Sequence, residues 1–301
     1  MAPAKPEVIQ KTNRKEPIMT KMPKSGMAKF RQMKASGEKI SMITAYDYAM
    51  ARCVAASPID LILVGDSLGM VVLGYKNTLE VTVEDMIRHC AAVRRGAPEA
   101  FIIIDMPFMS YHISSQETKR NAARLLVEGG ANAVKLEGGS ASRIEAIKAI
   151  VDCEIPVCAH LGLTPQSVFK LGGYKVQGKS AHDYEIILAE AKEVEAAGAF
   201  MLVLEGIPEL LGKQISQELR IPTIGIGAGR YTDGQVLVVN DLLNFSDMQA
   251  KFVKTYAELN PLITEALSAY HAEVREGTFP TPEHTYYPIN SIEGQENDRE
   301  D

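Results

Sequence analysis

Several features that would point to a membrane or to nucleic acid are missing from this 301-residue sequence. No apolar run approaches the roughly 20 residues needed to span a bilayer. Positive charge is not in excess, and the net charge of −6 argues against binding to nucleic acid or to an anionic membrane surface. No secretory apolar segment lies near the start, and the acids among the first 25 residues disfavour an organellar address. We therefore expect a cytoplasmic protein.

The spacings that characterise zinc sites are also missing. No CxxC pair, HxH or HExxH spacing occurs, so a zinc site is not expected. Three of the four cysteines stand in apolar surroundings, and we expect reduced core residues of an intracellular protein. The four are Cys53, Cys90, Cys153 and Cys158.

The two ends of the chain differ in composition from the middle. Residues 1–25 are rich in Lys and Pro and have no apolar periodicity, whereas residues 289–301 are acidic and polar. Neither end can bury enough apolar surface to fold, so both are expected to be disordered tails. The remaining residues, 26–288, have the composition of a soluble globular protein and are predicted to form a single domain.

Eight short β-branched runs alternate with helix-like segments between these tails. The helix-like segments, of which 117–130 and 184–198 are examples, carry apolar residues at three- and four-residue spacing and close with glycine. This alternation indicates a parallel sheet buried on both faces, and eight units in about 250 residues are usual for a (β/α)8 TIM barrel. A doubly wound sheet is the alternative. The predicted strands are 39–45, 59–65, 100–106, 133–137, 155–160, 200–205, 221–227 and 235–240.

Ionisable and polar residues stand where most of the early strands end. In a parallel barrel the carboxyl ends of all strands meet at one face, which is where active sites of this fold lie. Two segments of the chain, 128–137 and 195–205, have a similar pattern, which supports this arrangement. In each, a glycine lies seven residues before the glutamate that ends the strand, Glu137 or Glu205. The strand-end residues are Tyr46, Asp47, Asp66, Ser67, Asp105, Lys135, Glu137, His160 and Glu205.

Three of these residues, Asp66, Asp105 and Glu137, would put three carboxylates at one mouth. Like charges so close raise each other's pKa unless a cation neutralises them. Carboxylate oxygens together with water suit Mg²⁺ or a similar hard ion. The alternative is that each acid pairs with a nearby Lys or Arg. The clustering at strand ends favours the metal site.

The other strand-end residues have more than one possible role. Lys135 lies two positions before Glu137 and so points to the same face, where it could hold an anionic substrate group, form a Schiff base or balance charge. Glu205 stands on a later strand, away from the acids, which suits a catalytic base better than a surface ion pair. His160 could donate a hydrogen bond to substrate or anchor the loop that follows it.

Two glycine-bearing stretches need separate interpretation. The sequence GIGAG at 225–229 is a weak match to a dinucleotide fingerprint, and we prefer a tight, close-packed turn to a phosphate site. The segment 162–180 is basic and contains aromatic residues. It could be a lid over the site or an exposed connection.

Many separated segments, in one order, resemble the ketopantoate hydroxymethyltransferase family over roughly residues 27–287. The sequence departs from the family pattern at Glu80 and Arg88, and neither of these is a strand-end residue. The matching stretches include TAYDY, LVGDSLGM, TVEDMIRHCAAVRRGAP, DMPFMSY, VKLEGG, VCAHLGLTPQ, GGYKVQG, LVLEGIP, IPTIGIGAG and TDGQ.

This resemblance implies a barrel of the phosphoenolpyruvate/pyruvate type and a homodecamer. It also implies transfer of a hydroxymethyl group from 5,10-methylenetetrahydrofolate to 3-methyl-2-oxobutanoate, which gives 2-dehydropantoate for pantothenate and coenzyme A synthesis. One Mg²⁺ per subunit would be held by Asp66, Asp105 and Glu137, the last directly or through water. The oxo acid would contact Asp66, Ser67, Asp105, Lys135 and His160, and Glu205 would be the base.

The implied chemistry is a magnesium-stabilised enolate. Binding of the oxo acid to Mg²⁺ would polarise its ketone, Glu205 would take the C3 proton, and the enolate would attack the one-carbon unit. Three other functions remain open from the residues alone. They are a C–C lyase that needs no folate, a nicotinamide-dependent oxidoreductase that uses residues 225–229, and a non-catalytic barrel.

Overall fold

The computed structural model describes residues 26–246 and 250–287. The chain divides into two compact units, of which the first ends at Val236 and the second begins at Leu237. Both predicted tails, residues 1–25 and 289–301, lie outside the described residues. That a single domain extends from residue 26 to residue 288 stays a prediction.

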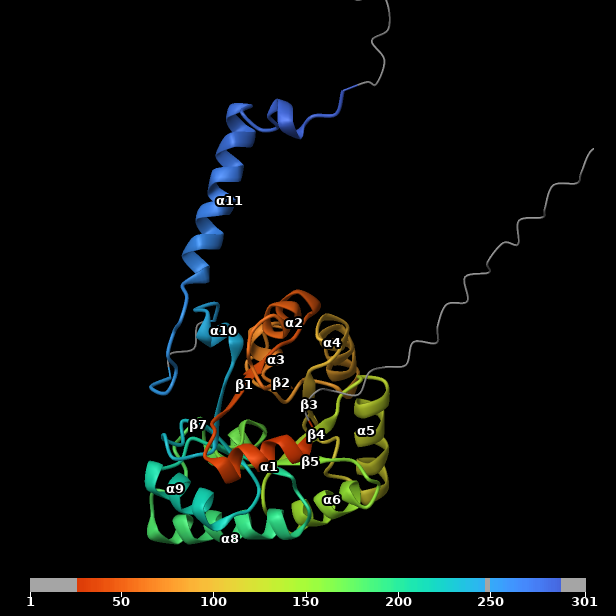
Figure 1. Ribbon diagram of the computed structural model, residues 1–301, viewed down its shortest axis with the longest axis vertical. Coiled ribbons are helices and arrows are strands. Elements are labelled where there is room, and N and C mark those ends of the chain that lie inside the picture. The colour runs from red at the N-terminus through yellow and green to blue at the C-terminus, as the bar shows by residue number, and fades with distance from the viewer. Residues whose placement is uncertain (1–25, 247–249, 288–301) are drawn as a thin grey trace, which may run out of the picture. The chain divides into compact units, whose positions relative to one another are not determined.

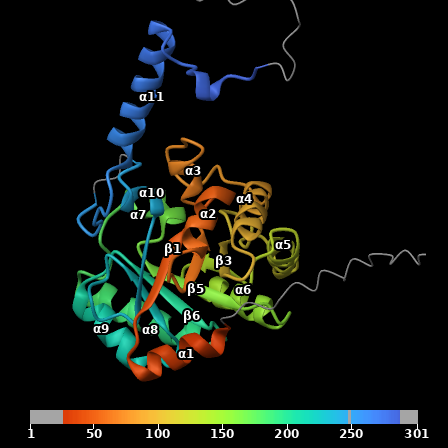
Figure 2. The same cartoon turned by 45° about the horizontal axis from the view of Figure 1, so that its top comes forward.

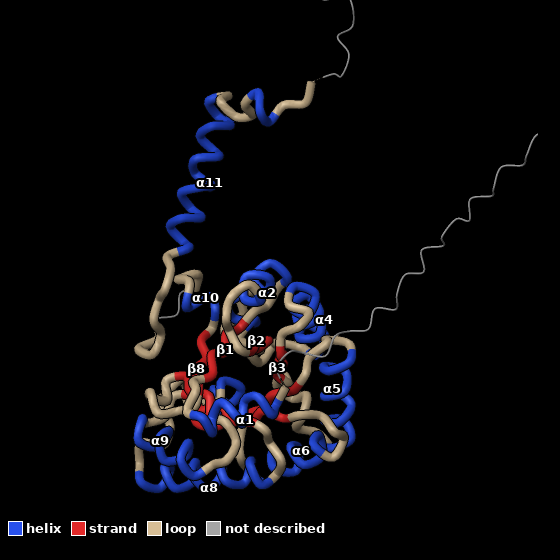
Figure 3. The backbone as a smooth tube through the Cα atoms, viewed as in Figure 1, coloured by secondary structure: helices blue, strands red, loops and turns tan. Residues whose placement is uncertain are grey.

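The first unit is built around a closed barrel of eight strands in sequence order, which confirms the predicted TIM barrel. Every strand pair whose register is known is parallel. Figure 3 shows the strands in red with the helices outside them. The strands are β1 (Ile40–Thr44), β2 (Leu61–Val64), β3 (Phe101–Asp105), β4 (Ala133–Glu137), β5 (Val157–Gly162), β6 (Met201–Glu205), β7 (Thr223–Ile226) and β8 (Gly234–Leu237).

Helices connect most of the strands and surround the barrel (Figure 1). The two predicted helices correspond to α5 and α8, whose N-caps Ser114 and Ser180 each accept a bond from the backbone N–H three residues on. The first-unit helices are α1 (Met27–Ser36), α2 (Tyr48–Ala55), α3 (Leu68–Val71), α4 (Val83–Gly96), α5 (Ser115–Val127), α6 (Ala141–Val151), α7 (Val168–Leu171), α8 (Ala181–Ala196) and α9 (Glu209–Glu218). A 3₁₀ turn, η1 (Pro165–Ser167), precedes α7.

The second unit contains α10 (Val239–Leu242), α11 (Leu259–Glu276) and the 3₁₀ turn η2 (Pro282–His284). Here the strand prediction 235–240 is wrong at its end, because β8 stops at Leu237 and α10 starts two residues later. A short apolar run does not by itself distinguish a strand from a helical turn. No helix of the described ranges is long and apolar enough to cross a membrane.

Apolar packing closes the barrel at the end where its strands begin. Phe30 of α1 meets Phe101 edge-on at 5.2 Å between ring centroids, and Phe101 meets Phe200 at 5.9 Å. All three rings are buried, and burying a ring of this size contributes roughly 1.5–3 kcal/mol. Figure 2 shows α1 lying across this end. The opposite end of the barrel is left for polar side chains.

The cysteines are all free, but the expectation that three of the four are core residues is wrong in part. Cys90 and Cys158 are buried, whereas Cys53 and Cys153 are exposed. Cys53 lies on the outer side of α2, and Cys153 lies in the turn that follows α6. Apolar neighbours in the sequence therefore do not determine which face of a helix a residue occupies.

Candidate active site

The carboxyl ends of β2 to β6 bring the predicted site residues to one end of the barrel, which we call the mouth. Strand register places Asp105 beside Lys135, Glu137 beside His160, and Gly162 beside Glu205. Each of the five inner side chains is at most 5% exposed, and Glu205 at the rim is 16% exposed. The five are Asp66, Asp105, Lys135, Glu137 and His160.

Lys135 makes the strongest ionic contact of the mouth. Its Nζ donates to Asp105 Oδ1 at 2.6 Å, and both side chains are 5% exposed. Burial would lower the pKa of Lys135, but the charges of Asp105, Glu137 and Asp66 raise it well above its usual value. A lysine that holds its proton so firmly is a poor nucleophile, which disfavours the Schiff base and favours a role in holding negative charge.

The ionised form of Asp66 is disfavoured in the mouth. Its pKa is raised well above the usual value by burial first and then by Asp105 and Glu137, which Lys135 and Gln166 only partly offset. Asp66 and Asp105 are also joined directly, because Asp66 N donates to Asp105 Oδ2 at 3.1 Å. Two basic side chains, Lys135 and His160, face four carboxylates in the mouth, which leaves room for a further cation.

The donor set fits Mg²⁺ through two carboxylates. Within the described residues, no group of three or more His, Cys, Asp or Glu side chains is placed to hold a metal ion. Mg²⁺ does not require such a group, because it commonly takes one or two protein carboxylates and completes its shell with water and substrate oxygens. Asp66 and Asp105 can supply these two ligands, and Glu137 can act through water.

His160 lies between two glutamates. Its Nδ1 is 3.5 Å from Glu137 Oε1 and its Nε2 is 3.3 Å from Glu205 Oε2, although neither contact has the geometry of a hydrogen bond. Burial and Lys135 would lower the pKa of His160, yet the two glutamates raise it to about 9. A cationic imidazole here would be a charge partner for both carboxylates.

Ser67 enters the mouth on the tight turn that follows β2. Its Oγ lies 2.8 Å from the hydroxyl oxygen of Tyr46. The turn depends on Gly65, since a Cβ there would lie 2.9 Å from Ser67 Oγ. Asp47 has a different role from the other strand-end residues, because it caps α2 by accepting a bond from Met50 N at 2.8 Å.

The sequence interpretation missed two buried residues of the mouth, Gln166 and Tyr111. Gln166 Nε2 donates to Asp66 Oδ2 at 2.8 Å, and the Tyr111 hydroxyl donates to Gln166 Oε1 at 2.6 Å. Both stand in matched stretches of the family resemblance, VCAHLGLTPQ and DMPFMSY, and that was the available signal.

The segment 162–180 divides into two parts. Its first part is packed into the mouth through Gln166, which is 6% exposed. Its second part is open, with Phe169 80% and Tyr174 46% exposed. The Tyr174 hydroxyl donates to Met70 Sδ at 3.6 Å, so this ring lies beside α3, the helix that follows Ser67. The arrangement favours a cover over the site.

Residues 225–229 form the close-packed turn that we preferred. A Cβ at Gly225 would lie 2.7 Å from Thr232 Oγ1, and one at Gly229 would lie 2.3 Å from Glu209 Cγ. Gly229 also has a φ of +81°, in the left-handed region. The packing therefore accounts for these glycines without a phosphate ligand.

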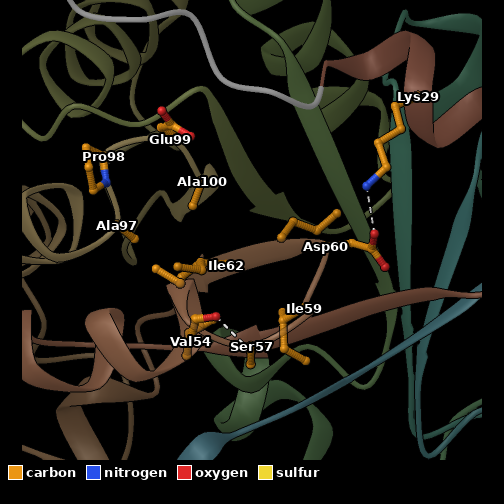
Figure 4. Close-up of a pocket in the computed structure, with 12 residues that line it drawn as sticks. Lys29, Val54, Ser57, Ile59, Asp60, Ile62, Ala97, Pro98, Glu99 and Ala100 are labelled. Carbon is orange, nitrogen blue, oxygen red and sulfur yellow. Dashed lines mark hydrogen bonds and ion pairs between the residues drawn. The ribbon is translucent and has the colours of Figure 1, made fainter.

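A cavity of about 420 Å³ lies at the other end of the barrel, where β2 and β3 begin (Figure 4). Its walls include Asp60, which is paired with Lys29 at 2.8 Å, and residues 97–100. None of the predicted site residues lines this cavity.

Comparisons with known proteins agree on one family. A family model described as ketopantoate hydroxymethyltransferase matches residues 24–282. A 3-methyl-2-oxobutanoate hydroxymethyltransferase of Geobacillus thermodenitrificans is 55% identical over 86% of this chain and 93% of its own length. The enzyme of the same name from Syntrophomonas wolfei is 53% identical over 85% of this chain and 93% of its own length.

Solved structures support the fold. A 2,3-dimethylmalate lyase, described as a member of the PEP mutase/isocitrate lyase superfamily, superimposes with a TM-score of 0.55, covering 85% of this chain and 92% of its own, at 16% identity. An oxaloacetate acetylhydrolase gives a TM-score of 0.57, with 87% and 90% coverage, at 14% identity. At this identity the likeness extends to the barrel and not to the reaction.

Proposed function

The chain belongs to the ketopantoate hydroxymethyltransferase family, and we propose that it transfers a hydroxymethyl group from 5,10-methylenetetrahydrofolate to 3-methyl-2-oxobutanoate. The product would be 2-dehydropantoate, a precursor of pantothenate. The observation that carries this proposal is the mouth itself, in which Asp66, Asp105 and Lys135 lie together in a chain that matches the family over most of its length. A homodecamer is part of the same proposal and rests on the resemblance, and a cytoplasmic location is proposed from the sequence.

The oxo acid would be held by the charged and hydroxyl groups of the mouth. Asp66 and Asp105, with Glu137 through water, would hold Mg²⁺, which when bound supplies polarisation of the substrate ketone. Lys135 offers a buried positive charge to the negative end of the substrate. Ser67 adds a hydroxyl whose orientation is set by Tyr46 at 2.8 Å.

Glu205 would remove the C3 proton as the catalytic base. Its side chain is 16% exposed at the rim of the mouth, on β6, whereas Asp66 and Asp105 come from β2 and β3. His160 Nε2 lies 3.3 Å from this carboxylate and would be its charge partner. One water molecule takes part in the reaction. The one-carbon unit forms bonds to C3 and to the water oxygen as its two bonds to folate nitrogens break, and the C3 proton and one water proton end on those nitrogens. Tyr174 and the open part of residues 162–180 would limit access of further water.

Isotope exchange at C3 tests the base without requiring folate. In D₂O with Mg²⁺, wild-type protein should exchange the C3 hydrogen of 3-methyl-2-oxobutanoate, as followed by proton NMR. Glu205→Gln should lower the rate by about 10²–10⁴-fold, which is typical of losing a general base, while the oxo acid still binds. The matched control is Glu209→Gln, because Glu209 pairs with Arg230 at the surface at 3.1 Å.

Exchange at the wild-type rate in the Glu205→Gln variant would exclude Glu205 as the base. Wild-type protein that consumes the oxo acid only when tetrahydrofolate and formaldehyde are supplied together would distinguish the transferase from a folate-independent lyase. Consumption without folate would contradict the proposed donor.

A further inference from the structure

Gln166 supplies an uncharged side chain within the mouth, and its hydrogen bonds reach two of the three carboxylates. Its Nε2 donates to Asp66 Oδ2 at 2.8 Å, and its backbone N donates to Glu137 Oε2 at 3.0 Å. Nε2 donates its second hydrogen to Met106 O at 2.9 Å. Because the side chain is 6% exposed, water does not compete strongly for these bonds.

Tyr111 fixes the orientation of this amide. Its hydroxyl donates to Gln166 Oε1 at 2.6 Å and accepts from Glu137 N at 3.3 Å. If the amide were turned over, Oε1 would face Asp66 Oδ2 and Met106 O, which are both acceptors. The contacts therefore allow one orientation of the amide, in which it donates to Asp66, while the backbone N of the same residue donates to Glu137.

We infer that Gln166 is a positioning residue that orients the carboxylates of Asp66 and Glu137 for the cation, with Tyr111 holding Gln166 in turn. This inference rests on the proposed function for its purpose, since the cation belongs to that proposal. A neutral amide suits the task, because it orients the acids without cancelling the negative charge that a cation needs. Gln166 stands in η1, so the same bonds attach the segment after β5 to the mouth.

Binding of Mg²⁺ alone, without oxo acid or folate, tests this directly by titration calorimetry. Gln166→Met keeps the length of the side chain and removes the amide nitrogen and oxygen, whereas the backbone N–H that donates to Glu137 stays. We expect it to weaken Mg²⁺ binding by about 10–100-fold, which is typical when a partner of a ligating carboxylate is removed. The matched control is Gln214→Met on α9, where the Tyr184 hydroxyl donates to Gln214 Oε1 at 2.7 Å and Gln214 Nε2 donates to Glu218 Oε1 at 2.8 Å. This change should alter Mg²⁺ affinity less than about twofold.

A second comparison tests the link through Tyr111. Tyr111→Phe should weaken Mg²⁺ binding by several-fold, and adding it to Gln166→Met should cost less than the product of the two single effects. Circular dichroism and melting temperature establish that each variant is folded. If Gln166→Met does not fold, Tyr111→Phe decides the question in its place.

Mg²⁺ affinity equal to wild type in folded Gln166→Met, or in Tyr111→Phe where that variant decides, would overturn the positioning role. If the effects of the two single substitutions on Mg²⁺ affinity multiply fully in the double variant, the claim that Tyr111 acts through Gln166 is overturned. Wild-type protein that binds no Mg²⁺ would contradict the proposed function and, with it, the purpose of this positioning, so the two failures are distinguishable.

Discussion

The two ends of the barrel hold the same kinds of charged residue in different surroundings. Where the strands begin, Lys29 pairs with Asp60 at 2.8 Å, and the side chains are 44% and 16% exposed. Where the strands finish, Lys135 pairs with Asp105 at 2.6 Å, and both are 5% exposed. The first pair is one lysine for one acid, whereas the second shares its lysine with Asp66 and Glu137.

The pKa values of Asp60 and Asp66, which lie just before and just after β2, show this difference. Burial acts to raise the pKa of Asp60, yet bonds from Lys29 and Ser41 hold it below its usual value. The pKa of Asp66 is raised well above its usual value by burial and by the acids beside it. Charge at the strand-start end is therefore locally satisfied and serves stability. At the mouth it is in excess, which favours binding of a cation.

Removing a single acid at each end of the barrel should give the largest difference in turnover. Asp66→Ala and Asp105→Ala should abolish turnover and its dependence on Mg²⁺, because these carboxylates are the proposed ligands. Asp60→Ala, at the other end, should keep kcat within about twofold of wild type. Steady-state assays across a Mg²⁺ titration check all three. Metal-stimulated turnover that survives in either mouth variant would count against the proposed site.

Replacing Lys135 should lower the free energy of unfolding by a few kcal/mol more than replacing Lys29. Lys135→Met leaves Asp105 buried without its partner, and breaking a buried pair in this way costs about 3–5 kcal/mol. Lys29→Met breaks a partly exposed pair, for which about 0–1 kcal/mol is expected. Urea unfolding at pH 7 with EDTA measures both. Equal losses would mean that the two pairs are not distinguished by burial.

The stabilisation from Asp60 should depend on pH with a definite sign. Because its pKa is lowered on folding, the stabilisation is present above the unfolded value of about 3.9 and is lost as the pH falls through the folded value. Asp60→Asn should therefore cost about 1 kcal/mol at pH 7 and progressively less below about pH 4. Urea unfolding of both proteins across this range gives the comparison. A difference that grows toward acid would contradict the assignment.

The smallest expected effect concerns thiol reactivity. Burial raises the pKa of both Cys90 and Cys158 to about 12, whereas Cys53 and Cys153 are exposed. At pH 8 a disulfide reagent should label the two exposed thiols quickly and the other two only after unfolding, because the thiolate is the reactive form. Rapid labelling of native Cys158 would show that the inside of the barrel opens more readily than its packing suggests.

The sequence by itself determined the barrel and the residues that its strands carry to the mouth. Short apolar runs alternating with helices specify a parallel sheet, and parallel strands of a barrel direct all their carboxyl ends to one face. Asp66, Asp105, Lys135, Glu137 and Glu205 follow from this rule without knowledge of any contact. Their roles came from the family resemblance and from the chemistry of carboxylates.

Only the tertiary structure decided which groups contact one another. Gln166 and Asp66 are 100 positions apart, and Tyr111 and Gln166 are 55 apart, so no local pattern connects them. The same limit explains Asp47, which stands at a strand end in the sequence but caps α2 in the fold. Periodicity determines the direction in which a side chain leaves its own element. Hydrogen bonds between loops depend on how several elements pack, which becomes defined only when the barrel has closed.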